Sequence, residues 1–447
     1  MYYINKQAPS KTLIYRSHIQ SLLVYSLSVP ASSNMSPPWR PGKRVAIAGG
    51  GPGAISTGLA FLQRGYDVRI FEKQRTCQAT GGAVLLSIPV LAILRAYGLT
   101  SDNFGSYTRT TFANKWGKER VQLPFNAEVE RRMGIQGWQY GVLRSTIFAK
   151  MLELVPEGVI YTGHEVTGYE EKRASGEEDS GVQIRFKNGS TMMADILVAA
   201  DGIRSTVSRQ AFGEPGLFHT GIRVWLAWCD QIPGIPAHHG VISHDWQYQA
   251  SFFPMMREGR RPGFEWWVVE PSYEGKPAPA DPRAHLTAIL QNWAQPMPRL
   301  LEATEFNSQV YRWEVYNRPS LQKWSAGRVV GVGDAVHPVS PYAAYGMGMA
   351  IEDGYYLARA LDGVDLCDPR AVAAGFELYE QQRVHYANHH MEFARFSGSM
   401  FHRLPWPLAK VRDLIFDHTP VLGMLLKKDY LQRAEEETMN LRELQVV

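Results

Sequence analysis

The chain has 447 residues, of which 45% are hydrophobic and 20% charged, and its formal net charge is +4. This length and balance are typical of a globular protein with more than one domain, and the small, evenly spread charge does not indicate a nucleic-acid partner. Cys77, Cys229 and Cys367 are too few and too scattered for a disulfide framework, and no spacing of metal ligands is evident. No apolar stretch reaches the roughly 18 residues that suggest a transmembrane helix.

The N-terminal segment differs from the rest, because residues 1–66 contain no acidic side chain and Asp67 is the first. Such a leader, with Arg, Lys and Ser, is typical of an organelle transit peptide, so organelle targeting by residues 1–34 is one interpretation. The other is an extension in front of a start at Met35, in a cytoplasmic protein. Prolines and serines crowd its end, so residues 1–43 are predicted to be leader and linker without fixed structure.

The first predicted elements are a strand, a helix and a second strand. Residues 44–48 form an apolar run that predicts a buried parallel strand, and a glycine-rich turn follows it. A helical pattern then runs through Arg64, and a second strand is expected at residues 68–71. The order indicates a βαβ unit.

The turn of this unit fits the Gly-x-Gly-x-x-Gly pattern that binds a dinucleotide pyrophosphate at a helix N-terminus. Gly49 makes the tight turn, Gly51 lets the backbone approach the phosphates, and Ala54 stands in the third place with Gly53 beside it. Glu72 lies 23 residues after Gly49 and ends the second strand, where a carboxylate accepts hydrogen bonds from the adenosine ribose. These features predict a dinucleotide site but do not choose between NAD and FAD.

Further along the chain, Asn188-Gly189 between two apolar runs predicts a hairpin. From Arg223 to Pro271, short aromatic-rich runs alternate with turns, which indicates an antiparallel sheet inserted in the α/β scaffold. The remaining predicted elements are helices at 89–97, 144–155, 350–361 and 371–390, strands at 181–186, 191–193, 196–199, 224–229, 248–253, 264–269 and 329–332, and mixed helix and loop from 403.

Several later motifs resemble those of one family. Gly333-Asp-Ala-Val-His-Pro-Val-Ser-Pro341 is similar to the Gly-Asp-x-x-His-x-x-x-Pro motif of flavoprotein monooxygenases related to p-hydroxybenzoate and salicylate hydroxylases. Ala200-Asp-Gly-Ile-Arg-Ser205 resembles that family's Asp-Gly motif, which is associated with FAD and NAD(P)H, and Arg144 resembles its helix-start arginine, which contacts FAD. Ala350-Ile-Glu-Asp353 and Tyr379-Glu-x-x-Arg383 also match in order and spacing.

The resemblance covers residues 44–400 and implies an α/β fold, in which a Rossmann-like FAD-binding domain carries an inserted antiparallel β-sheet substrate domain and C-terminal helices. The expected FAD-binding domain comprises residues 44–220 and 321–400. Residues 221–320 are expected to form the substrate-domain sheet, and residues 401–447 a C-terminal helical extension.

Residues of these motifs also have physical reasons to contact a flavin. Asp334 follows a buried strand, so its carboxylate stands at the carboxyl end of a sheet and can bind ribityl hydroxyls. A helix that starts near Gly348 directs its N-terminus at the flavin N1–C2=O edge, where reduced flavin carries negative charge. Arg144 opposes the dipole of its helix, so a ligand contact explains it better than a structural salt bridge. Asp201 either contacts a ligand or caps a turn, and His337 is interpreted as scaffold.

The cofactor predicted from these residues is FAD, with NADPH or NADH as co-substrate and no metal. The predicted cofactor-binding residues are Gly49, Gly51, Gly53, Ala54, Glu72, Lys73, Gly82, Ala83, Arg144, Asp201, Asp334, Gly346 and Met347. The chain departs from the family at Ala344-Tyr345-Gly346, where Gly-Gln-Gly is usual, at Ile88-Pro-Val90, and at Trp225-Leu226, where a Trp-Arg pair is common. The lost arginine argues against a strongly anionic substrate at that point.

The resemblance implies flavin reduction by NAD(P)H, addition of O₂ at flavin C4a, and oxygen transfer from a C4a-hydroperoxyflavin to a small molecule. Aromatic residues of the inserted sheet suit a planar, mostly apolar substrate, although alternate positions must face the core instead. No residue is assigned a catalytic role with certainty. The pocket candidates are Trp225, Tyr248, Phe253, Trp267 and Pro341, within an aromatic set that also includes Trp228, Phe252 and Trp266.

Phenol, indole and polyketide-like substrates stay open, and so do hydroxylation, epoxidation and Baeyer–Villiger oxidation. Alternative functions are a flavin-dependent halogenase, a reductase of isoprenoid double bonds, and a non-catalytic FAD-binding partner. The halogenase motif Trp-x-Trp-x-Ile-Pro has no match, since the nearest segment is Trp266-Trp-Val-Val-Glu-Pro271. The expected partner is a small, aromatic molecule, and the protein is expected to be a monomer or homodimer.

Overall fold

The computed structural model describes residues 38–79, 81–100, 105–123, 131, 139–172, 180–257, 261–340, 345–427, 433–441 and 444. The first described residues contact the domain that follows them. Trp39 Nε1 donates to the Met193 carbonyl at 2.8 Å, and the Arg40 guanidinium lies 2.6 Å from the Asp67 carboxylate. The segment expected to lack fixed structure, residues 1–43, is therefore too long at its C-terminal end, because Trp39 and Arg40 pack against the domain.

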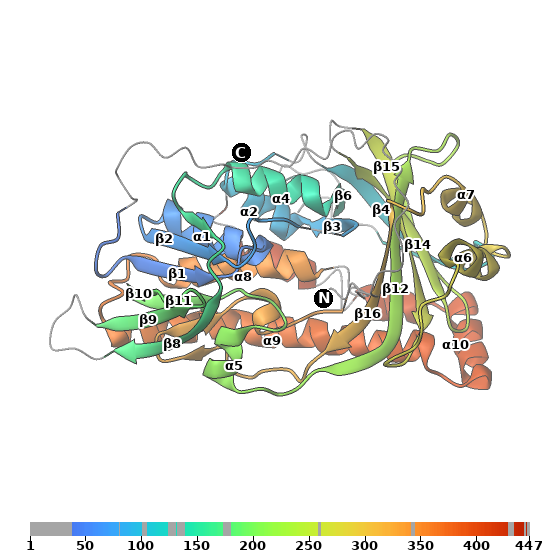
Figure 1. Ribbon diagram of the computed structural model, residues 1–447. Coiled ribbons are helices and arrows are strands. Elements are labelled where there is room, and N and C mark those ends of the chain that lie inside the picture. The colour runs from blue at the N-terminus through green and yellow to red at the C-terminus, as the bar shows by residue number, and fades with distance from the viewer. Residues whose placement is uncertain are drawn as a thin grey trace, which may run out of the picture.

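A mainly parallel sheet forms the first layer, with the strand order β17-β18-β11-β1-β2-β7 (Figure 1). Its strands are β1 (Arg44–Ala48), β2 (Asp67–Glu72), β7 (Ile160–Thr162), β11 (Ile196–Ala199), β17 (Ser325–Ala326) and β18 (Val329–Gly331). The central strand β1 pairs in parallel with β2 and with β11, and all of its residues are buried. Burial on both faces explains why its sequence is a continuous apolar run rather than an alternating one.

Helices cover this sheet, and two of them cross very closely. The helices are α1 (Pro52–Gln63), α2 (Ile88–Ala96), α4 (Arg144–Glu153), α5 (Thr206–Phe212) and α8 (Gly346–Ala360). A Cβ at Gly53 would lie 3.2 Å from the Ala350 Cβ, and a Cβ at Gly354 would lie 2.5 Å from the Thr57 nitrogen. Gly53 and Gly354 therefore let α1 and α8 meet almost backbone to backbone, and this contact fixes how closely the two helices cross.

A small antiparallel sheet covers part of the parallel sheet. It has the order β10-β9-β8, and its strands are β8 (Val166–Lys172), β9 (Gly181–Phe186) and β10 (Thr191–Ala194). Val182 and Ile184 of β9 are buried in one cluster with Phe71 of β2. The turn between β9 and β10 contains Gly189 at a φ of +84°, as the predicted Asn-Gly hairpin requires.

A large sheet forms the second part of the fold, with the order β16-β12-β15-β14-β13-β4-β6-β3 and β5 paired with β4. Its strands are β3 (Ala83–Ser87), β4 (Ser106–Asn114), β5 (Glu119–Leu123), β6 (Gln139–Leu143), β12 (Phe218–Asp230), β13 (His239–His244), β14 (Gln249–Met256), β15 (Pro262–Pro271) and β16 (Val310–Asn317). The strands from β12 to β15 pair antiparallel, as predicted, but β13 joins β4 in parallel. The sheet thus takes in strands from residues 83–143, which the sequence placed with the FAD-binding domain.

The remaining helices join and extend the two parts. The helices are α6 (Pro282–Leu290), α7 (Met297–Glu302), α9 (Pro369–His402), α10 (Trp406–His418), α11 (Val421–Leu426) and α12 (Arg433–Asn440). Figure 1 shows the 34-residue α9 running from beneath the parallel sheet to the large sheet, where α10 follows it. Helices α6 and α7 pack on the outer face of the large sheet.

Candidate functional site

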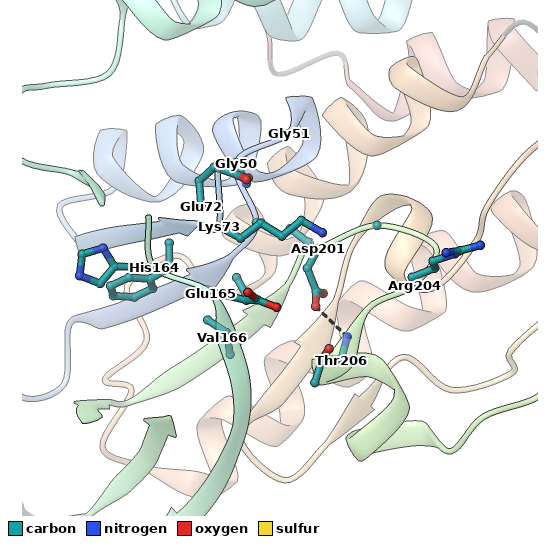
Figure 2. Close-up of a pocket in the computed structure, with 15 residues that line it drawn as sticks. Gly50, Gly51, Glu72, Lys73, His164, Glu165, Val166, Asp201, Arg204 and Thr206 are labelled. Carbon is teal, nitrogen blue, oxygen red and sulfur yellow. Dashed lines mark hydrogen bonds between the residues drawn. The ribbon is translucent and has the colours of Figure 1, made fainter. Parts of the chain in front are cut away.

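A cavity of about 250 Å³ opens at the carboxyl ends of β1, β2 and β11 (Figure 2). This edge is where open α/β sheets bind ligands. Residues from four separate segments line the cavity, among them Gly49, Gly51, Glu72, Lys73, Asp201 and Arg204. The structure therefore brings the predicted glycine turn, the predicted acid and the Asp-Gly segment together around one space.

The glycine turn leaves room for a ligand beside the first turn of α1. Gly49 has a φ of +103°, and a Cβ there would lie 2.4 Å from the Ala200 carbonyl oxygen. Gly51 is the N-cap of α1 and provides no side-chain cap, and no heavy atom outside the immediate chain lies within 4 Å of the place a Cβ would occupy. The backbone N–H groups at this helix end thus face open space, which suits a pyrophosphate.

Glu72 stands at the end of β2 and already supports the turn. The Gly50 N–H donates to Glu72 Oε2 at 2.7 Å, and the Gln74 N–H donates to Oε1 at 2.8 Å. Figure 2 shows Glu72 beside Gly50 and Gly51, with Lys73 extending away from β2 into the group of lining residues. Because the carboxylate retains unused lone pairs, it can also accept ribose hydroxyls at this position.

Asp201 holds its own turn. Its carboxylate accepts hydrogen bonds from the Ser205 hydroxyl and from the Thr206 N–H, the latter at 2.8 Å. Burial raises the pKa of Asp201, and these hydrogen bonds oppose that shift. The turn-capping interpretation is therefore correct for the carboxylate, while the residue still lines the cavity. Arg204 projects from the same loop at the far side of the group in Figure 2.

A second group of predicted residues lies where β3, α4 and α8 begin. The Arg144 N–H donates to the Gly82 carbonyl at 3.2 Å, so the start of α4 is fixed to the residue before Ala83 and β3. Asp334 is exposed in the short 3₁₀ helix Gly333–Ala335, directly after β18. Its carboxylate is therefore accessible at this strand end, and its contact with ribityl hydroxyls stays a prediction.

Helix α8 begins at Gly346, two residues before the predicted start, and Met347 follows in its first turn. The N-cap residue Tyr345 gives no side-chain cap, so this helix end can also receive a negatively charged edge. The phenol hydroxyl of Tyr345 donates a hydrogen bond to the Glu352 carboxylate and accepts one from the Ser87 hydroxyl at 3.0 Å. Tyr345, the departure from the family's loop, is therefore anchored to its own helix and to β3. Pro341 lies outside the described residues.

A buried network of ion pairs joins α8, α9 and α12. Arg383 of α9 is fully buried and contacts the carboxylates of Glu352 at 2.8 Å, Asp353 at 2.9 Å and Glu437 at 3.2 Å. His337 is also fully buried and bonds to Asp353, which agrees with a scaffold role. The family-like motifs at 350–353 and 379–383 thus join α8 to α9 through buried ion pairs and do not line the cavity.

The aromatic pocket candidates divide between the two faces of the large sheet. Phe253 and Trp267 share one cluster, with ring centroids 5.6 Å apart, and that cluster also contains Ala83 and Leu85 of β3. Trp225 and Phe252 belong to the opposite face with Trp266, against α6 and α7, and Tyr248 packs there too. Trp225 lines a separate cavity of about 470 Å³ on that outer face. Of the candidates, only Phe253 and Trp267 are therefore placed beside predicted flavin contacts, among the described residues.

No sequence motif singles out Glu265 of β15, which is fully buried on the same face of the large sheet as Phe253. Burial raises the pKa of its carboxyl group well above the usual range, while the Ala83 backbone and the charge of Arg144 oppose this shift. His164, Glu165 and Val166 also line the first cavity. They come from the segment between β7 and β8, and no sequence motif marks them.

The residues fit FAD as a bound cofactor. Two helix N-termini without side-chain caps, at α1 and α8, can receive the pyrophosphate and the N1–C2=O edge. Glu72 and Asp334 offer carboxylates for ribose and ribityl hydroxyls, and Gly51 has open space beside it. Among the described residues, no group of three or more His, Cys, Asp or Glu side chains could hold a metal ion.

Comparisons with known proteins agree with this geometry. Residues 43–394 match the family model described as an FAD binding domain. The chain is 27% identical over 357 residues to 6-hydroxynicotinate 3-monooxygenase of Bordetella bronchiseptica, covering 77% of this chain and 88% of the relative. It is 28% identical to aurachin C monooxygenase/isomerase of Stigmatella aurantiaca, covering 78% and 86%. The structure of Klebsiella pneumoniae HpxO with FAD and uric acid superposes with a TM-score of 0.73 at 22% identity, covering 88% of this chain and 97% of that one.

Proposed function

This chain belongs to the FAD-binding-domain family of FAD-dependent aromatic monooxygenases, and we propose that it uses NAD(P)H and O₂ to insert one oxygen atom into an aromatic or polycyclic small molecule. The overall reaction consumes substrate, O₂, NAD(P)H and a proton, and it yields oxygenated substrate, NAD(P)⁺ and water. One oxygen atom enters the substrate and the other leaves as water, so atoms and electrons balance.

One observation carries the proposal: the aromatic face of the large sheet meets the predicted flavin contacts. Phe253 and Trp267 lie in the cluster that contains Ala83, and Ala83 adjoins Gly82, to which the start of α4 is bonded. A planar ring held against this aromatic face would therefore be presented to the flavin-binding edge of the fold.

When bound, FAD would supply the redox chemistry between NAD(P)H and O₂. The chain supplies binding and orientation. The N-terminus of α1 and Glu72 would bind the pyrophosphate and adenosine ribose, and Asp334 the ribityl chain. The N-terminus of α8 would stabilise negative charge on the reduced flavin.

Apolar side chains provide the dry surroundings that such chemistry needs. On the face shared with Phe253, β12 contributes Ile222, Val224, Leu226 and Trp228, and β16 contributes Val315. None of these carries a charge, and burial raises the pKa of the acid on the same face, Glu265, well above its usual range. The one cation of β12, Arg223, lies on the other face in an ion pair with Glu314 at 2.6 Å. We therefore propose a neutral substrate, in agreement with the missing arginine of the Trp-Arg pair.

The test is mass spectrometry of the product formed under ¹⁸O₂ from the FAD-loaded protein with NADPH or NADH and a panel of neutral aromatic and polycyclic compounds. We expect the mass to rise by one ¹⁸O atom and NAD(P)H consumption to match product formation. Unlabelled product would contradict the proposal, and so would a halogenated product or a saturated double bond. A matched reaction in H₂¹⁸O under unlabelled O₂ should give no label.

A further inference from the structure

Helices α10 and α11 carry large apolar side chains on their outer side. Leu414 is 61% exposed and Met424 is 64% exposed, although both lie within regular helices. We call this surface the C-terminal apolar face, and it consists of Trp406, Leu408, Val411, Leu414, Met424 and Leu425. Contiguous exposed apolar surface of this kind marks an interaction site, since single exposed apolar residues are usually scattered.

The inner side of the same helices already has its packing partners. Phe416 of α10 and Leu422 and Leu426 of α11 are buried in one cluster with Phe112 and Phe401. Ala409 and Arg412 are also buried on α10, so the inward positions follow a helical period. The C-terminal apolar face is therefore a second, outward apolar surface that the core of the protein does not need.

The charged side chains at these helices also divide between two sides, with acidic groups inward and lysines outward. Asp413 and Asp417 point inward to Arg120, at 3.5 Å and 2.6 Å, and are only partly exposed. Lys410 and Lys427 are exposed, and within the described residues of α10 and α11 no acidic side chain is. The outward surface is thus apolar and basic, and a partner that complements it must be apolar and anionic.

The C-terminal apolar face lies outside the part of the chain that matches the family. It follows α9 at the edge of the large sheet, where α10 and α11 contact β5 (Figure 1). The family match ends at residue 394, so these helices lie beyond the matched domain. In the described part of the chain, no helix is long and apolar enough to cross a membrane.

We propose that α10 and α11 dock the protein onto the surface of an anionic lipid bilayer. The side chains of the C-terminal apolar face would enter the boundary between headgroups and acyl chains, with Trp406 at the headgroup level and Lys410 and Lys427 against the lipid phosphates. Helix α10 has 13 residues and is about 20 Å long, too short to cross a hydrocarbon core of about 30 Å. Its apolar side would therefore enter the bilayer with the helix in the interface plane.

A second copy of the chain is a poorer occupant than lipid. A two-fold contact places the same surface on both sides of the interface. The interface would then be basic on both sides, and no exposed carboxylate on the described parts of α10 and α11 could pair with Lys410 or Lys427. Anionic headgroups neutralise both lysines without that conflict.

The test is flotation of the full-length, FAD-loaded protein with vesicles of phosphatidylcholine alone or of equimolar phosphatidylcholine and phosphatidylserine. We expect binding to the phosphatidylserine vesicles that weakens as salt rises. The double substitution Leu414→Glu and Met424→Glu should weaken binding at least about tenfold. Lys410→Gln should weaken it about fivefold and only on anionic vesicles. Leu378→Glu, on an exposed leucine of α9 outside the face, is the matched control and should bind as wild type does.

The flavin absorbance of each variant shows whether its fold is intact, so loss of binding can be separated from unfolding. Wild-type protein that fails to float with anionic vesicles overturns the proposal, and so does a double variant that floats as well as wild type. A wild-type dimer that the double variant converts to monomer, without any vesicle binding, assigns the face to a second copy instead. Each of these results leaves the proposed oxygenation untouched, because the vesicle assay does not measure it.

Discussion

The carboxyl group of Glu265 on β15 lies directly against Gly82, at the entrance to β3. A Cβ at Gly82 would lie 2.0 Å from Glu265 Oε1, and even its Cδ would be 2.8 Å away. Gly82 is not among the glycines with positive φ, so the contact itself, rather than backbone strain, requires glycine there. The family motifs point to Gly82, and the reason that it must be glycine is its contact with Glu265, which no motif marks.

We expect Gly82→Ala to lower the free energy of unfolding by about 1–3 kcal/mol, because the added methyl overpacks a buried site. Glu265→Ala should recover part of that loss in the double variant, since it removes the atoms that clash, with a coupling energy of about 0.5–3 kcal/mol. Glu265→Gln keeps the shape and is the matched control, so it should recover nothing. Denaturant unfolding of the four proteins measures the cycle, and strictly additive effects would contradict the contact.

The pair formed by Tyr345 and Glu352 should make stability depend on pH. Burial, with the nearby Glu437 carboxylate, raises the pKa of Glu352 from 4.5 to about 8, while Arg383 opposes the shift. Between these values the folded protein keeps a proton that the unfolded chain has lost. The contribution of Glu352 to stability is therefore greatest below pH 4.5 and is lost as the pH rises toward about 8.

Glu352→Gln should flatten this part of the stability curve, since the amide resembles the protonated acid and cannot ionise. Tyr345→Phe removes a hydrogen bond that lowers the pKa of Glu352, so the loss of stability should begin at higher pH. Thermal unfolding across that pH range, compared with wild type, measures both effects. A wild-type curve that rises with pH relative to Glu352→Gln would show that the carboxylate is ionised and stabilising instead.

The local parts of the fold were predictable because their signals are local. The strand at 44–48 and the strand at 196–199 are buried on both faces, so their apolar runs alone identify them, and the structure gives the same bounds. The glycine turn and Glu72 were predictable for a similar reason, because the βαβ unit that brings them together is continuous in sequence. The buried strand at 329–332 ends one residue earlier, at Gly331.

The large sheet was less predictable because long-range pairing decides its content. Strand β4 pairs with β13, which lies more than a hundred residues later, and no local pattern in residues 106–114 indicates that pairing. The face on which each aromatic residue lies depends on register. Trp225 and Trp267 therefore face opposite sides, although both are tryptophans of neighbouring strands. Glu265 escaped notice because a single acid in an apolar strand usually marks an exposed position.

FAD binding should depend on Glu72 and Asp334 to different degrees. Glu72→Ala removes the acceptor of the Gly50 and Gln74 amides as well as a ribose contact, so the glycine turn itself should loosen. Asp334→Ala removes only an exposed carboxylate beside the predicted ribityl chain. We expect both purified variants to lose flavin, Glu72→Ala more completely, as read from the ratio of flavin to protein absorbance. A wild-type protein that is colourless and takes up no FAD would contradict the site.

The folded domain should begin between Met35 and Trp39. A chain that starts at Met35 keeps the Trp39 hydrogen bond and the Arg40 ion pair and should hold FAD as well as full length does. A chain that starts at Lys43 lacks both the Arg40 ion pair with Asp67 and the Trp39 hydrogen bond to Met193, so it should be less stable. Unfolding of the two chains measures the difference, and equal stability would show that the contacts of Trp39 and Arg40 contribute nothing.

NAD(P)H should reach the flavin without a nucleotide-binding fold of its own, because the sequence shows a single glycine fingerprint and we assign that fingerprint to FAD. Arg204 follows the Asp201 turn and lines the cavity from the side away from Glu72 (Figure 2). We expect Arg204→Ala to raise the KM for NAD(P)H about tenfold, the effect of one lost charge-assisted hydrogen bond. Its FAD content should stay near that of wild type, since the glycine turn, Glu72 and Asp334 are unchanged.

The control for Arg204 is Arg209→Ala on α5, a nearby surface arginine whose side chain is paired with Glu214 at 3.7 Å. It removes the same charge from the same region and should leave the KM unchanged if the effect is specific to the cavity. Steady-state oxidation of NADPH and NADH gives the KM, and the flavin absorbance of the same samples gives the FAD content. If Arg204→Ala loses its flavin while the KM for NAD(P)H is unchanged, Arg204 belongs to the FAD site. The reduced nucleotide must then approach from another side of the cavity.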